Sequence, residues 1–130
     1  MRKYDHSGSA LWSSPFRSGW GPSLAADATG LYVVATTYGY DAPFGYPPAP
    51  CGSLAEDAVV VKYDSSGNEL WTHQFSTASV DFASGVALDA NGIYVAGGRR
   101  TFQGFSTGGF LAKLEKTVPV DVKLHCPPEQ

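Results

Sequence analysis

The sequence predicts an all-β protein built from repeated units of four antiparallel strands. Two phrases recur along the chain in the same order, and both combine strand-forming residues with a turn containing glycine or asparagine. No window has the apolar periodicity of a helix. A repeat of roughly 50 residues is typical of propellers and solenoids, and four short strands per unit favour a β-propeller blade.

The first phrase reads KYDHSGSALW at residues 3–12 and KYDSSGNELW at residues 62–71, so that Trp71 lies 59 residues after Trp12. In the second copy, two runs rich in β-branched and aromatic residues flank the sequence SSGN at residues 65–68. Glycine and asparagine tolerate the positive φ of a tight turn. This phrase therefore predicts a β-hairpin.

The second phrase reads LAADATGLYVVA at residues 24–35 and VALDANGIYVAG at residues 86–97. The dipeptide Asn91-Gly92 in the later copy is a strong hairpin signal, so a second hairpin is expected there. We interpret Asp64 and Asp89, which precede the two turns, as side chains that accept backbone N–H bonds two residues on.

A third, partial copy begins with GGFLAKLE at residues 108–115, which aligns with DAVVVKYD at residues 57–64. The basic period is then 51 residues, the spacing of Lys62 and Lys113, and the first unit is longer because of an insertion. We assign residues 1–57 to the first unit with an aromatic and proline-rich insertion at 37–57, residues 58–108 to the second, and residues 109–130 to a partial third unit and tail. About two and a third units are too few to close a ring, so either the chain is a fragment of a longer polypeptide or several copies associate.

The two phrases together resemble the SBBP-type β-propeller repeat of bacterial secreted and surface proteins, from Arg2 to about Lys116. The resemblance implies an extracellular or cell-surface location and a scaffold or interaction role without naming a ligand. The Asp-x-x-Gly-x-x-x-Trp part is also similar, more weakly, to the tryptophan-docking repeats of quinoprotein propellers.

The register of the repeat places large side chains at equivalent positions. Trp12 and Trp71 share one phase and are expected to fill the wedge between neighbouring blades, while Trp20 aligns with Phe82. One strand face carries the residues Val59, Val61 and Tyr63, which align with Phe110, Ala112 and Leu114. An isolated chain should then expose two unpaired blade faces carrying the indoles and self-associate.

Composition excludes several functions. The net charge is −3 and the basic residues are scattered, which argues against nucleic-acid binding. No apolar run is long enough for a membrane span, and no apolar signal region follows Met1. Cys51 and Cys126 lack the spacing of a metal or redox motif, so they either form one disulfide bridge or remain free thiols.

No motif indicates catalysis, a cofactor or a metal. His6, His73 and His125 lack ligand spacing, and His73 shares strand parity with Trp71 and Phe75, where a partly covered histidine is ordinary. The turn at residues 64–69 lacks the ligand pattern of a calcium loop. We therefore expect a chain without enzymatic activity, or a fragment of a propeller enzyme whose active site lies elsewhere.

The insertion is the stretch in which we look for a ligand. Prolines stiffen the loop, and its aromatic faces and carboxylates suit a sugar ring or a peptide. The candidate residues are Tyr38, Tyr40, Asp41, Phe44, Tyr46 and Asp57. Alternatively, the loop folds back over the blade edge. The sequence thus predicts an interaction or display scaffold, with a carbohydrate- or peptide-binding module as the alternative.

Overall fold

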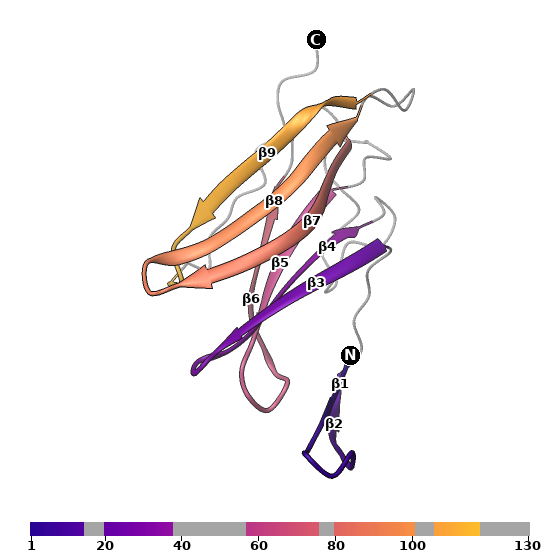
Figure 1. Cartoon of the computed structure of the whole chain (residues 1–130), viewed down its shortest axis with the longest axis vertical. Helices are drawn as coiled ribbons and strands as arrows, with labels where there is room; N and C mark the ends of the chain where they lie inside the picture. The colour runs from indigo at the N-terminus through magenta and orange to yellow at the C-terminus, as the bar shows by residue number, and fades with distance from the viewer. Residues whose placement is uncertain (15–19, 38–56, 76–79, 101–105, 118–130) are drawn as a thin grey trace.

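A computed structural model of the chain describes residues 1–14, 20–37, 57–75, 80–100 and 106–117. These residues form nine β-strands in three antiparallel sheets and no helix, which confirms the predicted all-β class (Figure 1). The sheets do not form a closed ring within this part of the chain.

The first sheet is a two-stranded N-terminal hairpin, in which β1 (Arg2–Tyr4) pairs with β2 (Ala10–Ser13). Figure 1 shows it at one end of the molecule, beside the turn that joins β5 and β6. Met1 closes the open end of the hairpin, because its amino group donates to the Ser14 carbonyl and its own carbonyl accepts the Ser14 N–H.

The middle sheet contains four strands, each paired with its neighbour in the chain. They are β3 (Trp20–Asp27), β4 (Gly30–Thr37), β5 (Asp57–Tyr63) and β6 (Glu69–Phe75). Strand β5 is central and buried at all its residues, and its sequence contains the continuous apolar run of residues 58–61. The predicted β5–β6 hairpin is confirmed.

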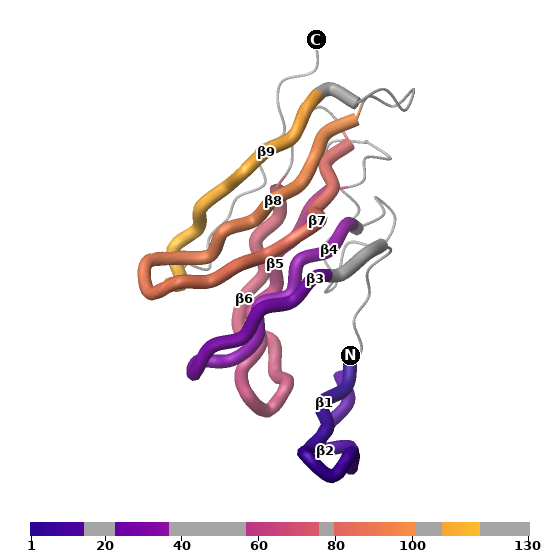
Figure 2. Tube along the Cα trace, in the orientation of Figure 1, coloured from indigo at the N-terminus to yellow at the C-terminus, as the bar shows by residue number. Residues whose placement is uncertain are grey.

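The C-terminal sheet contains three strands in the order β7 (Val80–Asp89), β8 (Gly92–Arg100) and β9 (Ser106–Leu114). The predicted β7–β8 hairpin is also confirmed, with the loop formed by Ala90 and Asn91. The tube in Figure 2 shows this sheet lying across the middle sheet, and strand β7 packs against β3, β4 and β5.

The strands follow the repeat in the sequence. Strands β7, β8 and β9 occupy the places of β3, β4 and β5, and the N-terminal hairpin corresponds to the β5–β6 hairpin. The middle sheet spans residues 20–75 and so draws strands from both of the first two sequence units. Sheets and sequence units therefore have the same period with a different phase.

Aspartate side chains stabilise the hairpin turns through hydrogen bonds from the backbone. The Asp64 carboxylate accepts the backbone N–H of Ser66 at 2.8 Å, and that of Asp89 accepts the N–H of Asn91 at 2.7 Å. Both bonds are as predicted. Asp5 and Asp27 make the same contact two residues on, so the device recurs at all four described hairpin turns.

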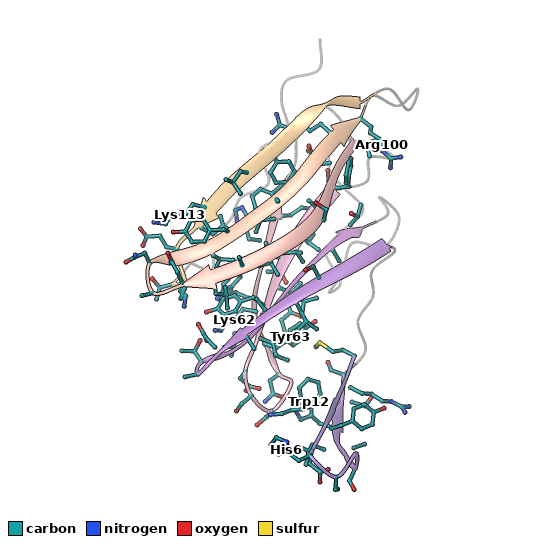
Figure 3. The ribbon with its side chains drawn as sticks, viewed as in Figure 1. His6, Trp12, Lys62, Tyr63, Arg100 and Lys113 are labelled. Atoms are coloured by element: carbon teal, nitrogen blue, oxygen red, sulfur yellow. The ribbon has the colours of Figure 1, made fainter. Side chains whose placement is uncertain are left out.

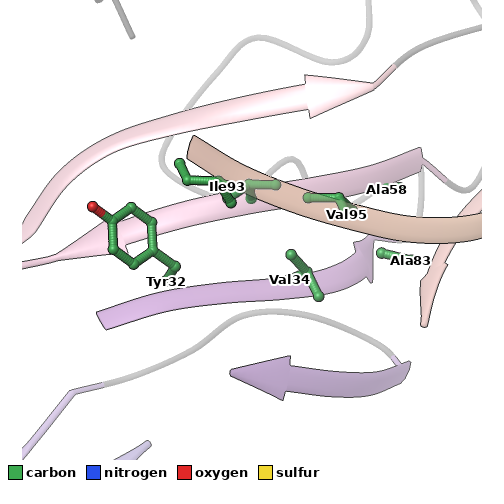
Figure 4. Close-up of a cluster of buried hydrophobic side chains, with 7 residues drawn as sticks. Tyr32, Val34, Ala58, Ala83, Ile93 and Val95 are labelled. Atoms are coloured by element: carbon green, nitrogen blue, oxygen red, sulfur yellow. The ribbon is translucent and has the colours of Figure 1, made fainter. Parts of the chain in front are cut away.

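The main core lies between the middle and C-terminal sheets (Figure 4). Alternate residues of the strands point into it, as expected of sheets packed face to face. Its buried members are Tyr32, Val34, Ala58, Val60, Ala83, Ile93 and Val95. A second cluster occupies the opposite face of the middle sheet and comprises Val33, Ala35, Val59, Val61 and Tyr63, with Met1 and Leu31 packed against it.

The predicted strand faces are also present. Val59, Val61 and Tyr63 share one face of β5, and their repeat equivalents Phe110 and Leu114 share the face of β9 that packs on the main core. On β9 these side chains face the middle sheet, and on β5 their equivalents face away from the C-terminal sheet.

Candidate interaction surfaces

Most of the predicted ligand-binding residues lie outside the part of the chain that the structure describes. These are Tyr38, Tyr40, Asp41, Phe44 and Tyr46. The same is true of Cys51 and Cys126. Only Asp57, at the end of the insertion, can be placed.

Asp57 opens β5 and is 7% exposed. Its Oδ2 atom accepts a hydrogen bond from Gln74 Nε2 at 2.5 Å. The pKa of Asp57 is raised to about 6, mainly by burial. The bond from Gln74 lowers this pKa, and the negative charge of Asp81 contributes to raising it. Asp81, in β7, is 1% exposed and pairs with Arg99 Nε at 3.1 Å. Two buried carboxylates from two sheets therefore influence one another at this end of the core.

Trp12 joins the N-terminal hairpin to the middle sheet. Its Nε1–H donates to the carbonyl oxygen of Ser65 at 3.0 Å, and Lys3 Nζ donates to the same oxygen at 3.4 Å. The indole lies against Gly67, where a Cβ atom would stand 2.8 Å from Trp12 Cε3. Figure 3 shows Trp12 between the hairpin and the β5–β6 turn. Glycine is needed at position 67 both for this close approach and for its φ of 85°.

Trp71 lies at the edge of the main core. Its ring makes an edge-on contact with Tyr32, with centroids 6.2 Å apart, and packs against the buried cluster. The expectation that unpaired outer faces carry both indoles is therefore corrected, because Trp12 bonds to the β5–β6 turn and Trp71 packs against the main core. Trp20 opens β3 opposite Thr36, and its side chain is outside the described part. Phe82 covers Gly98 and lies under the Arg100 guanidinium.

A charged cluster closes one end of the interface between the middle and C-terminal sheets. Lys62 is 4% exposed, lies 3.8 Å above the centre of the Tyr32 ring and donates to the Thr29 hydroxyl. Lys116, which follows the end of β9, donates from Nζ to Asp27 Oδ2 at 2.8 Å. The bond from Lys116, followed by that from Thr29, holds the pKa of Asp27 well below its usual range. The ion pair thus links one sheet to the next.

The C-terminal sheet carries an equivalent cluster on its outer face, which we define as the face turned away from the middle sheet. Tyr94 donates to Asp89 Oδ2 at 3.0 Å, and Lys113 Nζ lies 5.6 Å from the centre of the Tyr94 ring. Figure 3 labels Lys113 on this sheet. Asp89 and Lys113 are exposed here, and Leu111 is 75% exposed.

Of the three histidines, the structure describes two, and neither belongs to a metal-binding group among the described residues. His73 is half-buried and stacks edge-on with Phe75 at 4.8 Å, in agreement with its strand parity, and burial lowers its pKa. His6 is exposed at the tip of the N-terminal hairpin (Figure 3), and His125 is outside the described residues. No group of three metal-binding side chains occurs in the described ranges. Among the same residues, no helix is long and apolar enough to cross a membrane.

The ion pairs of the described residues were not predicted from the sequence. Lys116 and Asp27 are 89 residues apart, and no local pattern connects them. Asp81 and Arg99 are cross-strand partners in the β7–β8 hairpin. Counting residues outward from the turn would have placed Asp81 within one residue of its correct partner. The repeat alone could have shown that Tyr32 with Lys62 recurs as Tyr94 with Lys113.

Comparisons with known proteins add no family. No protein-family model matches the chain, and no curated protein matches it significantly.

Proposed function

We propose that this chain is a non-enzymatic interaction or display scaffold that forms part of an extracytoplasmic β-propeller of the SBBP type. The supporting observation is that the middle and C-terminal sheets, whose strands align in the repeat, pack face to face through the main core. The N-terminal hairpin contacts the β5–β6 turn of the middle sheet through Trp12. Stacking of repeat-equivalent sheets is the organising principle of propellers and other repeat proteins.

The polar side chains support a structural role. The carboxylates of Asp5, Asp27, Asp64 and Asp89 are all engaged by the backbone of their own turns. Hydrogen bonds to the ionised form lower the pKa of each of these groups, and such carboxylates are poor proton donors or acceptors near neutral pH. They stabilise turns instead of serving chemistry.

The experiment that tests this function is to determine the flanking coding sequence. Further copies of the Lys-Tyr-Asp and Leu-Trp phrases, bringing the total to about four to eight units, are expected. A leader peptide should precede them and an anchoring or display segment should accompany them. Flanks without any further copy, or an appended domain with a complete catalytic site facing these sheets, would refute the scaffold.

A further inference from the structure

The C-terminal sheet has one strand fewer than the middle sheet within the described part of the chain. In the middle sheet, β5 lies between β4 and β6, whereas its repeat equivalent β9 pairs only with β8 among the described residues. Figure 1 shows β9 as the outermost strand of its sheet. The backbone N–H and C=O groups on the side of β9 turned away from β8 form an edge to which a further strand can bond.

A strand equivalent to β6 has a candidate in the last residues of this chain. One period of 51 residues after β6 comes the sequence VDVKLHC at residues 120–126, which lie outside the described part of the chain. Apolar and polar residues alternate along the whole stretch, as is typical of a β-strand. The apolar residues are Val120, Val122, Leu124 and Cys126.

The phase of this alternation is that of β6. In β6, Trp71 and Phe75 share one strand face and pack against the main core. Val122 and Cys126 occupy the places of these two residues in the repeat, and the polar residues at 123 and 125 align with polar residues of β6. A shift of one residue would move every apolar side chain to the other face, so the match selects one register.

The connection between β9 and the candidate strand has the length of the β5–β6 turn. Residues 64–68 form that turn, and residues 115–119 form the connection. Its turn conformation must differ, because Val118 stands in the place of Gly67, which has a φ of 85°. Pro119 favours extended backbone at Val118 and is itself tolerated at the start of a strand.

The two connections also begin on equivalent paths. After β5, the carbonyl oxygen of Ser65 accepts a hydrogen bond from Trp12 of the N-terminal hairpin. After β9, the repeat equivalent of Ser65 is Lys116, which bonds to Asp27 of the middle sheet. Each connection is therefore held against the sheet that precedes its own, and the chain bends at residues 116–117.

From these observations we propose that residues 120–126 add to the open edge of β9 as a fourth antiparallel strand. In the register of β5 with β6, Cys126 lies opposite Gly109 and Val122 lies opposite Lys113. The pairing depends on the repeat alignment that also supports the proposed function, and it assigns the occupant of the β9 edge to this chain. The strand protects an edge that could otherwise pair with other chains.

Amide hydrogen exchange of the complete wild-type chain, followed by NMR, tests the pairing. Successive residues of a strand point their N–H groups to opposite sides, so alternate amides of β9 face away from β8. If a fourth strand bonds to them, these amides should exchange at least about 100-fold more slowly than in an unfolded chain. The amides of β5, which is paired on both sides, are the internal control.

Disulfide formation in a Cys51→Ser background tests the register. Gly109→Cys should form an intramolecular disulfide with Cys126, because directly opposite residues have Cα atoms about 4.5–5.5 Å apart. A Cβ atom at Gly109 has room, since its nearest neighbour is the Gly97 carbonyl oxygen at 3.4 Å. The matched control is Lys113→Cys, on the same face but roughly 13 Å from Cys126, which should react at least about ten-fold more slowly.

Both substituted positions are exposed, so circular dichroism should show that both variants are folded. Alternate β9 amides that exchange as fast as in an unfolded chain would overturn the proposal. Equal rates of disulfide formation in the two variants would also overturn it, as would disulfides that join two molecules, which would assign the edge to a second copy. None of these results bears on the number of repeat copies in the flanking sequence, so a failure here is distinguishable from a failure of the proposed function.

Discussion

Truncation to alanine at two repeat-equivalent positions, Val60 and Leu111, should lower the free energy of unfolding by very different amounts. Val60 is 0% exposed between the sheets, whereas Leu111 is 75% exposed. In Val60→Ala, the loss of two methyl groups removes about 1.6 kcal/mol of transfer free energy at about 0.8 kcal/mol each. The cavity left between two sheets brings the total to about 2–3 kcal/mol. Leu111→Ala removes more atoms, but most are already in water, so its cost should stay below about 0.5 kcal/mol.

Urea unfolding at low micromolar concentration, followed by tryptophan fluorescence, measures both costs on a monomer. With a slope of about 1–3 kcal/mol/M, Val60→Ala should lower the midpoint by about 1–2 M and Leu111→Ala should barely move it. The slopes of the two variants should match that of the wild-type chain. Equal costs at the two positions would refute the packing of the C-terminal sheet over the middle sheet.

Three further predictions concern single groups. Gly67→Ala should cost at least about 1 kcal/mol more than Gly8→Ala in urea unfolding, because both positions have positive φ but only at Gly67 would the new Cβ meet the indole of the N-terminal hairpin. Asp57 has a pKa raised to about 6 by burial, so its proton stabilises the fold below about pH 4 and this contribution is lost as the pH rises through 6. Asp57→Asn should remove up to about 3 kcal/mol of that pH dependence, and an unchanged profile would contradict the burial. Lys116→Met should destabilise the chain at low salt by an amount that shrinks in high salt, whereas Lys113→Met, on the outer face, should not.

The strands and their hairpins could be predicted because the signals are local, whereas the grouping of the strands into sheets could not. Alternation of apolar residues in β7–β9, the continuous apolar run of β5 and the turn residues each act within a few positions. The turn hydrogen bonds accepted by Asp64 and Asp89 were predictable for the same reason, since acceptor and donor are two residues apart.

The arrangement of the sheets depends on contacts that the local pattern does not specify. The repeat places Trp12 and Trp71 in one phase, yet Trp12 bonds to the backbone of a turn and Trp71 packs on Tyr32. The first indole depends on Gly67, where a Cβ atom would stand 2.8 Å from Trp12 Cε3.

The exact cross-strand partner of Asp81 could not be predicted for a related reason. The register of β7 with β8 shifts between Ala83 and Gly85, so Asp81 faces Arg99. Counting from the turn without this irregularity would have paired Asp81 with Arg100 instead. A β-bulge changes the strand register by one residue, and the adjacent sequence does not predict the bulge unambiguously.

The most direct test of the central claim is to measure contacts across the two sheets by NMR with methyl-labelled valine, leucine and isoleucine. If the repeated phrases form sheets packed face to face, the methyl groups of Val34 and Val60 should show strong cross-relaxation with those of Ile93 and Val95. At low concentration the Leu111 methyl groups should show no such contact with the middle sheet. The stacked arrangement would be contradicted if no cross-relaxation were seen between the valines of β4 and β5 and the side chains of β8. Strong cross-relaxation between Leu111 and the middle sheet would also contradict it.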